Sequence, residues 1–212
     1  MSLLMLQMNV KDIRCIALDA MGVIYRVGDD VKDLLYPFIL EKRGPDDFDH
    51  LSATYLKASL GEISARDFWN EVGLDASLED EYLRGHRLND GLLDFLQAAG
   101  SRGIEVWCLS NDLAEWSAKL RRNFKLHEYF KEAVISGAVR LRKPDPAIYD
   151  LFIRRSGYEA GDIVFIDDNV RNLDSAAGVG LKTILFDPLR LGGNAGHVVV
   201  CSFEELRKLI FI

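Results

Sequence analysis

The sequence has no long apolar run, little cysteine and no excess of positive charge. No apolar stretch approaches the roughly 18–20 residues that cross a bilayer, so we expect neither a transmembrane helix nor a membrane partner. Lysine and arginine number 26 against 33 aspartates and glutamates, and the net charge of −7 argues against nucleic acid as a partner. Cys15, Cys108 and Cys201 lie inside apolar runs without metal spacing, so we expect buried free thiols. No charge precedes Lys11 and no small-residue cleavage site is present, so we expect no signal peptide and a cytoplasmic protein.

Repeats and low-complexity tracts are also absent, and 49% of the residues are apolar, which excludes intrinsic disorder. Short, almost continuously apolar runs recur instead, each followed by a polar or glycine-bearing break and a helical pattern. Runs without alternation are typical of parallel strands that are buried on both faces. We therefore predict an α/β protein with a parallel sheet. The expected strands are Ile13–Leu18, Ile104–Leu109, Ala133–Ile135, Ile163–Ile166, Leu181–Phe186 and Val198–Cys201.

One long segment interrupts this alternation of strand and helix. Between the first two strands, residues 28–89 contain no good strand and are too long for a connecting loop. We predict an inserted helical subdomain there, within a core made of residues 1–27 and 90–212. Its expected helices are 31–43, 46–60, 65–72 and 78–87, interrupted near Gly61, and a helix over 89–100 leads into the second strand. A capping box of Ser202 and Glu205 predicts the last helix, which buries Phe203, Leu206 and Leu209.

Polar side chains follow several of the predicted strands. In open α/β sheets, ligands bind at the carboxyl ends of the strands, so the residues found there are candidates for a site. The candidates comprise three carboxylates, a hydroxyl and an amide at a helix start, and a lysine. They are Asp19 after the first run, Ser110 and Asn111 after the second, Lys143 before the fourth, and Asp167 and Asp168 after the fourth.

This set of side chains suits phosphoryl transfer from an organic phosphate. A carboxylate and a phosphate ~4 Å apart repel by several kcal/mol at an effective dielectric of about 20. A hard divalent cation such as Mg²⁺, which favours oxygen ligands, removes that repulsion. Asp19 and Asp168 are candidate ligands, with Asp167 acting through water. Ser110 and the amides at its helix start are candidates for binding phosphate oxygens, and Lys143 for stabilising transition-state charge.

Each of these residues alone also has a purely structural interpretation. Aspartates and serines after strands commonly cap helices or form turns, and a lysine is usually a solvated surface charge. The adjacent acids Asp167 and Asp168 are less easily explained, because two buried carboxylates repel unless a cation joins them. We interpret the four histidines as surface or packing residues, and Trp69, Trp107 and Trp116 as core residues.

Four segments, in this order, resemble the motifs of the haloacid dehalogenase-like hydrolase superfamily. LDAMGVIY resembles the first motif, LSND the second, RKPDPAIY the third and FIDDNVRNLDSAA the fourth, and the likeness extends over nearly the whole chain. SLGEISARDFW resembles the loop and helix of the helical cap that one subfamily carries between the first two motifs. The resemblance implies a Rossmann-like core and a mobile helical cap that closes over the substrate.

The resemblance also implies how a metal and a nucleophile would be arranged. Asp19 would be the nucleophile, forming an aspartyl-phosphate that water then hydrolyses. Asp168, Asp19 and the main-chain carbonyl of Met21 would bind Mg²⁺, and Asp167 would support the metal shell.

Further positions match the parts of the family that hold the substrate. Ser110, the Asn111 amide and Lys143 would bind the phosphate, and Gly61 and Glu62 would lie near the specificity loop of the cap. The resemblance thus implies a Mg²⁺-dependent phosphatase that acts on a small phosphorylated metabolite.

One position departs from the pattern of the family's phosphatases. Most of them have a second aspartate two residues after the nucleophile, where this chain has Met21. That aspartate protonates the leaving oxygen and then activates water, and the loss of such a group commonly costs about 10²–10⁴ in rate. A good leaving group, a hydroxyl of the substrate, Tyr25 or a residue of the cap are the alternatives for this role.

Met21 also keeps two other functions open. The 2-haloacid dehalogenases of the superfamily lack this acid, because a halide leaves without a proton, but they need no metal and have lost the paired acids of the fourth motif. A non-catalytic protein that binds a phosphorylated metabolite is the other alternative. Because Asp167 and Asp168 are both present, the phosphatase is the favoured prediction.

Overall fold

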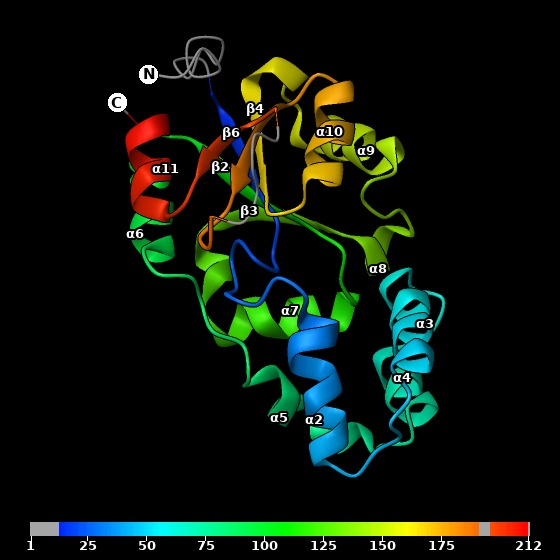
Figure 1. The fold of residues 1–212 in the computed structure, drawn as a ribbon. Coiled ribbons are helices and arrows are strands. Elements are labelled where there is room, and N and C mark those ends of the chain that lie inside the picture. The colour runs from blue at the N-terminus through cyan, green and yellow to red at the C-terminus, as the bar shows by residue number, and fades with distance from the viewer. Residues whose placement is uncertain (1–12, 191–195, 212) are drawn as a thin grey trace.

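Six parallel strands form one sheet in the computed structural model, which describes residues 13–190 and 196–211 (Figure 1). The strand order is β3-β2-β1-β4-β5-β6, and every neighbouring pair is parallel. Each strand coincides with one of the predicted apolar runs, so the predicted α/β class is confirmed. Residues 1–12, on which the signal-peptide expectation rests, lie outside the described residues. The strands are β1 (Cys15–Leu18), β2 (Glu105–Ser110), β3 (Phe130–Ile135), β4 (Ile163–Asp167), β5 (Lys182–Phe186) and β6 (Val198–Val200).

Alternate residues of the central strands face opposite sides of the sheet, and both sides are apolar. In β1, Ile16 and Leu18 belong to one buried cluster, whereas Cys15 and Ala17 belong to another. Burial on both sides explains why the strands are continuous apolar runs in the sequence. The first cluster includes side chains of α6 (Leu92–Gly100), α7 (Ala114–Asn123) and α11 (Phe203–Ile210), and the second those of α9 (Pro146–Ser156) and α10 (Val170–Gly178) (Figure 1).

The last helix differs in detail from its prediction. Ser202 accepts a hydrogen bond from the Glu205 amide, as a capping box requires, but the Glu205 carboxylate accepts from the amide of Cys201. Leu209 is only half-buried and Ile210 is buried in its place. Leu206 and Ile210 lie three and seven residues after Phe203 and share its buried helix face. Leu209 lies six residues after Phe203, at the margin of that face.

The thiols are free, as expected, although their burial differs. Cys15 and Cys108 are buried, and burial raises the pKa of each to about 12, so neither thiol is a nucleophile at neutral pH. Cys201 is only partly buried, because it lies beyond the end of β6. No helix among residues 13–190 and 196–211 is both long and apolar enough to cross a membrane.

The segment between β1 and α6 is helical, as its sequence predicts. It lies beyond one end of the sheet, below the strands in Figure 1. The division into a core and a cap of residues 28–89 stays a prediction. The elements are a π-helical turn (Val31–Leu35) that runs into α2 (Tyr36–Glu41), then α3 (Phe48–Ser59), α4 (Ala65–Glu71), a 3₁₀ turn (Ala76–Leu78) and α5 (Glu79–Leu83).

The two connections between this segment and the sheet pair with each other. The Arg26 amide donates to the carbonyl of Arg87, the Asn89 amide donates to the carbonyl of Ile24, and Tyr25 forms an antiparallel bridge with Leu88. This pairing explains why the helix expected over 78–87 ends early, since its last residues are extended instead. We refer to residues 22–27 and 87–89 as the paired connections.

A buried carboxylate joins the helical segment to the core. Glu79 Oε2 accepts from the indole nitrogens of Trp69, at 3.2 Å, and Trp116, at 2.8 Å. Its other oxygen lies 2.6 Å from the ammonium of Lys119. Trp69, Trp107 and Trp116 are all buried, so their interpretation as core residues is confirmed.

The layer between the sheet and helices α9 and α10 yields a test of packing. Leu173 on α10 is fully buried, so Leu173→Ala removes apolar contacts and leaves a cavity, which should lower the free energy of unfolding by about 2–5 kcal/mol. Leu189 is 74% exposed, and Leu189→Ala, the same chemical change, should alter it by under about 0.5 kcal/mol. Urea unfolding of the two variants measures the difference, and equal losses would contradict the described packing.

Candidate active site

The carboxyl ends of β1, β2 and β4 meet at one pocket. Asp19 follows β1, Ser110 ends β2, and Asp168 follows β4, and all three line a pocket of about 860 Å³. Of the other predicted residues, Met21, Asn111 and Lys143 line it as well, whereas Asp167 is fully buried behind its wall. The sheet therefore brings together side chains that are far apart in the sequence, as the positions of the strand ends predict.

Lys143 joins two of the predicted acids. Its ammonium nitrogen lies 2.7 Å from Asp19 Oδ1 and 2.7 Å from Asp167 Oδ2, and the lysine is only 2% exposed. Burial alone would lower the pKa of Lys143, but the charges of Asp167 and Asp19 outweigh it and the pKa is raised. Lys143 is therefore a fixed positive charge beside Asp19 and not a solvated surface lysine.

The side chain of Asn111 holds the backbone of Lys143 in place. Asn111 Nδ2 donates to the Lys143 carbonyl, and the Lys143 amide donates to Asn111 Oδ1, both at 2.9 Å. The sequence indicated only that the backbone amide of Asn111 would bind phosphate. The structure adds that its side chain, at the end of β2, fixes the loop that carries the lysine.

Both carboxylate oxygens of Asp167 have hydrogen-bond partners. Both of its oxygens accept from Asn172 Nδ2 at 3.1 Å, one accepts from the Asn169 amide at 2.8 Å, and the other contacts Lys143. These bonds occupy both oxygens of a fully buried side chain. Asp167 therefore supplies negative charge and orients Lys143 without facing the pocket.

Asp168 reaches into the pocket where two glycines leave room. A β-carbon built on Gly22 would lie 2.0 Å from Asp168 Oδ2, and one built on Gly28 would lie 2.8 Å from the same atom. Gly22 also has a φ of +77°, which side-chain-bearing residues rarely adopt. Both glycines are thus required for the placement of this carboxylate, a role that sequence reasoning missed because the contact joins distant positions.

The three carboxylates form a site that fits a hard divalent cation. Each of Asp19, Asp167 and Asp168 offers an oxygen, and these atoms lie within 4.8 Å of one another. Burial raises the pKa of Asp19 to about 8, with Lys143 opposing and the neighbouring acids adding to the shift. Burial and the charge of Asp167 raise the pKa of Asp168 to about 6. One lysine does not balance three acids, and an all-oxygen donor set suits Mg²⁺.

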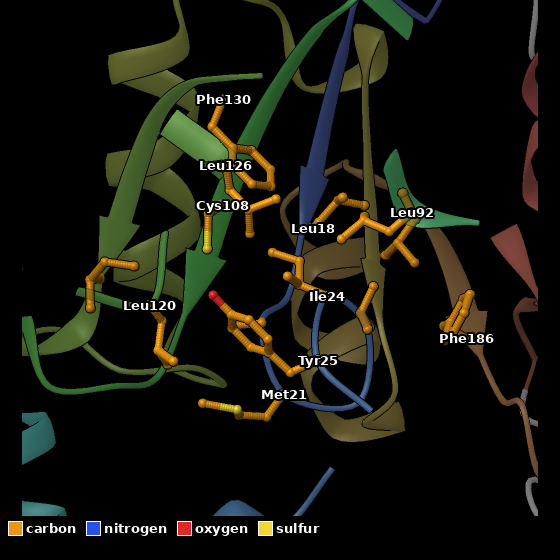
Figure 2. Close-up of a cluster of buried hydrophobic side chains, with 14 of the residues drawn as sticks. Leu18, Met21, Ile24, Tyr25, Leu92, Cys108, Leu120, Leu126, Phe130 and Phe186 are labelled. Carbon is orange, nitrogen blue, oxygen red and sulfur yellow. The ribbon is translucent and has the colours of Figure 1, made fainter. Parts of the chain in front are cut away.

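The first motif supplies no proton donor next to Asp19. Met21 lines the pocket but belongs to the buried apolar cluster (Figure 2). Tyr25 is 3% exposed, does not line the pocket, and packs its ring against His86 and Phe124. Its hydroxyl points toward Cys108 in Figure 2. Tyr25 is therefore not available to replace the missing acid, because the turn after β1 directs it into the core.

The helical segment forms the remaining wall of the pocket. Phe48, Ser52, Tyr55 and Leu56 line it from α3, and three of these side chains are largely apolar. Gly61 and Glu62, predicted to lie near a specificity loop, are not among the lining residues. A β-carbon on Gly61 would lie 2.3 Å from the carbonyl of Gly137, so Gly61 is required for a close contact with α8 (Ser136–Val139), the short helix after β3.

Curated proteins with similar sequences include two phosphate-releasing enzymes. Flavin mononucleotide hydrolase 1 of Arabidopsis thaliana is 30% identical over 129 residues, 59% of this chain and 52% of the relative. Phosphoglycolate phosphatase of Pseudomonas fluorescens is 26% identical over 163 residues, 73% of this chain and 58% of the relative. The chain thus spans just over half the length of these relatives.

Solved structures share the fold at lower sequence identity. The HAD-hydrolase YfnB of Bacillus subtilis, bound to magnesium, has a TM-score of 0.68 and 18% identity, with 94% of this chain and 99% of that chain covered. The L-2-haloacid dehalogenase of Xanthobacter autotrophicus, with chloropropionic acid covalently bound, has a TM-score of 0.66 and 17% identity, with 93% and 98% covered. These neighbours share the fold that the strand order of the sheet describes.

The family itself follows from the sequence motifs and the sheet together. The first, second and fourth motifs lie at the ends of β1, β2 and β4, the third lies in the loop before α9, and each of the four contributes residues that line the pocket. The family model of haloacid dehalogenase-like hydrolases matches residues 13–180, and the chain belongs to this family of hydrolases.

Proposed function

We propose that the chain is a Mg²⁺-dependent phosphatase that hydrolyses a small phosphomonoester through an aspartyl-phosphate on Asp19. One observation carries the proposal: Asp19, Asp167 and Asp168 place three carboxylates within 4.8 Å, with Lys143 as the ammonium between two of them. Asp19 and Asp167 are buried and Asp168 is exposed, and so close a grouping of carboxylates favours a cation. In this proposal residues 28–89 are a cap over the core, and the protein acts on a free metabolite in the cytoplasm.

The residues of the pocket would divide the reaction between them. Asp19 Oδ attacks phosphorus, and the bond between phosphorus and the ester oxygen breaks. Water then attacks the phosphorus of the aspartyl-phosphate and releases inorganic phosphate and free Asp19. Ser110, the Asn111 amide and Lys143 hold the phosphate oxygens on which negative charge concentrates. Mg²⁺, held by Asp19, Asp168 and the Met21 carbonyl with Asp167 in support, would screen the repulsion between carboxylate and phosphate.

The relatives support a phosphorylated substrate but differ in its size. One is named for flavin mononucleotide and the other for phosphoglycolate. The pocket volume of about 860 Å³ and the apolar wall formed by α3 are compatible with a substrate that has an organic body beyond its phosphate.

A second candidate function rests on Met21. A haloacid dehalogenase needs no proton donor at this position, and one of the structural neighbours is such an enzyme. Against it stands the network around Asp167, where Asn172, Asn169 and Lys143 all serve to hold an ionised acid beneath the pocket. A dehalogenase that binds no metal does not need the carboxylate of Asp167 to support a metal ion. A protein that binds a phosphate ester without turnover is the remaining alternative.

Replacement of the nucleophile tests the reaction. Asp19→Asn should abolish phosphate release from 4-nitrophenyl phosphate, sugar phosphates and nucleotides, because an amide cannot form the aspartyl-phosphate. Wild-type release should need Mg²⁺ and stop with EDTA. Asp94→Asn, at an exposed position of α6 outside the pocket, is the matched control and should retain activity. Colorimetric phosphate assays measure all three proteins.

The negative outcomes separate the alternatives. Unchanged turnover in Asp19→Asn would refute the proposed nucleophile. Halide release from 2-chloropropionate without phosphate release would identify a dehalogenase. Stabilisation by Mg²⁺ with a phosphate ester that survives unconverted would identify a binding protein.

Metal binding has a readout that does not depend on turnover. Mg²⁺ should raise the melting temperature of the wild type, because the folded state binds the ion more tightly than the unfolded chain. Asp168→Asn removes one carboxylate, so the shift with Mg²⁺ should disappear, while the metal-free protein should melt no lower because a repulsion is relieved. Asp150→Asn, exposed on α9, should keep the shift. Equal shifts in all three proteins would place the ion elsewhere.

Lys143 should matter for both stability and catalysis. Lys143→Met keeps the length of the side chain but leaves Asp19 and Asp167 without their buried partner, at a cost of about 3–5 kcal/mol in the free energy of unfolding without metal. Loss of the charge should also lower kcat by about 10²–10³. Lys131→Met removes an exposed ion pair with Glu105 and should cost under about 1 kcal/mol. A change in kcat below twofold would remove Lys143 from the active site.

A further inference from the structure

The pocket has a nucleophile and a metal site but lacks an obvious proton donor. Met21 occupies the position of the family's acid, and Tyr25 is buried outside the pocket. A poor leaving group such as an alkoxide needs a proton as it departs. The donor has to be another group that lines the pocket, and the helical segment supplies the acids Asp29 and Asp30.

Asp30 is an unusual aspartate for its place in the chain. It begins the helical stretch that continues through Val31–Leu35 and has a helical backbone (φ −66°, ψ −29°), whereas Asp29 before it accepts a capping hydrogen bond from the amide of Lys32. Asp30 is only 6% exposed, although it lines the pocket. The capping role at this helix start therefore belongs to Asp29, and the side chain of Asp30 is left for another role.

The surroundings of Asp30 favour the protonated acid. The hydroxyl of Tyr82 donates to Asp30 Oδ2 at 3.3 Å, and Tyr82 is itself packed among buried aromatic rings. Burial raises the pKa of Asp30 to about 6, with the Tyr82 hydrogen bond opposing and the charge of Asp29 adding to the shift. A buried acid with a raised pKa, lining the same pocket as the nucleophile Asp19, is suited to general acid catalysis.

We propose that Asp30 is the general acid and base of this enzyme, supplied by the helical segment in place of the acid that Met21 replaces. The inference rests on the proposed phosphatase function. In the first step the Asp30 carboxylic acid gives its proton to the ester oxygen as the bond from that oxygen to phosphorus breaks, which releases the alcohol. In the second step the Asp30 carboxylate takes a proton from water as the water oxygen attacks the aspartyl-phosphate, which frees phosphate and Asp19.

Two neighbouring groups are less suited to this role. Asp112 is buried with an unpartnered Oδ2, but it does not line the pocket. Tyr55 lines the pocket, but its pKa is raised well above its ordinary value by burial and by the charge of Asp30, so it is a poor proton donor at neutral pH. Asp29 is exposed and its side chain accepts from the amide of Lys32.

The test compares leaving groups that need a proton with one that does not. Asp30→Asn should lower kcat/KM for an alkyl ester such as glycerol phosphate by about 10²–10⁴. The value for 4-nitrophenyl phosphate should change little, because nitrophenolate leaves unprotonated. Because kcat/KM reports the steps up to release of the alcohol, the second step does not obscure the comparison. Asp33→Asn, an exposed acid one turn further along the same helical stretch, is the matched control and should leave both values unchanged.

The outcomes distinguish this inference from the proposed function. A wild type that releases no phosphate from either ester refutes the phosphatase and the role of Asp30 with it. A wild type that hydrolyses both esters, with Asp30→Asn losing neither or losing both equally while its fold is intact by circular dichroism, refutes Asp30 alone. Selective loss of the alkyl ester supports it.

A second measurement uses the wild type and is independent of whether the variant folds. The ratio of kcat/KM for the alkyl ester to that for the nitrophenyl ester should fall as pH rises through about 6, because only the protonated acid can donate. Ionisation of Asp19 affects both esters and cancels in the ratio. The two phosphates ionise at different pH, so each kcat/KM is first corrected for the measured fraction of dianionic ester. The ionisable groups around Asp30 are Tyr82, Asp29, Tyr55 and Asp112, and burial raises the pKa of Tyr82, Tyr55 and Asp112. A ratio independent of pH would overturn the proposal.

Discussion

The contact of one buried ammonium with two buried carboxylates organises the whole site. Lys143 is 2.7 Å from both Asp19 and Asp167, and removing the lysine would leave two buried carboxylates without their cationic partner. The surrounding hydrogen bonds serve this contact: Asn111 fixes the lysine backbone, and Asn172 orients Asp167. Because the three charges come from separate motifs, the contact also fixes the ends of β1 and β4 and the loop before α9 relative to one another. The site thus helps to hold this end of the sheet together.

The charge balance of this cluster explains how the pocket is divided. On the core side, the carboxylates of Asp19 and Asp168 face a lysine and a helix start, which is an environment for a metal and a phosphate. On the side of the helical segment, Phe48, Tyr55 and Leu56 form an apolar wall, and Asp30 lies within it. Acids on the two sides therefore have different chemical environments. The charge of Lys143 opposes the effect of burial on the pKa of Asp19, whereas the hydrogen bond from Tyr82 opposes it at Asp30.

Much of the core could be predicted from the sequence, because its signals are local. Strands covered on both faces are continuous apolar runs, and the residues after them, such as Asp19 and Asp168, fall at one edge of the sheet by topology alone. The contacts that could not be predicted join positions far apart in the chain. The pairing of Asn111 with Lys143, the room that Gly22 leaves for Asp168, and the burial of Asp30 all depend on tertiary packing. The burial of Tyr25 depends on the direction of the turn after β1, and the spacing of apolar residues in the sequence does not predict that direction.

The paired connections constrain how residues 28–89 can be displaced relative to the sheet. The chain enters and leaves the helical segment through two strands that are bonded to each other, from Arg26 to Arg87 and from Asn89 to Ile24. Two further contacts join the segment to the core: the indole of Trp116 donates to Glu79, and the hydroxyl of Ser136 donates to the carbonyl of Ser59. The position of a side chain such as Asp30 is in this way set partly by backbone whose own residues do not line the pocket.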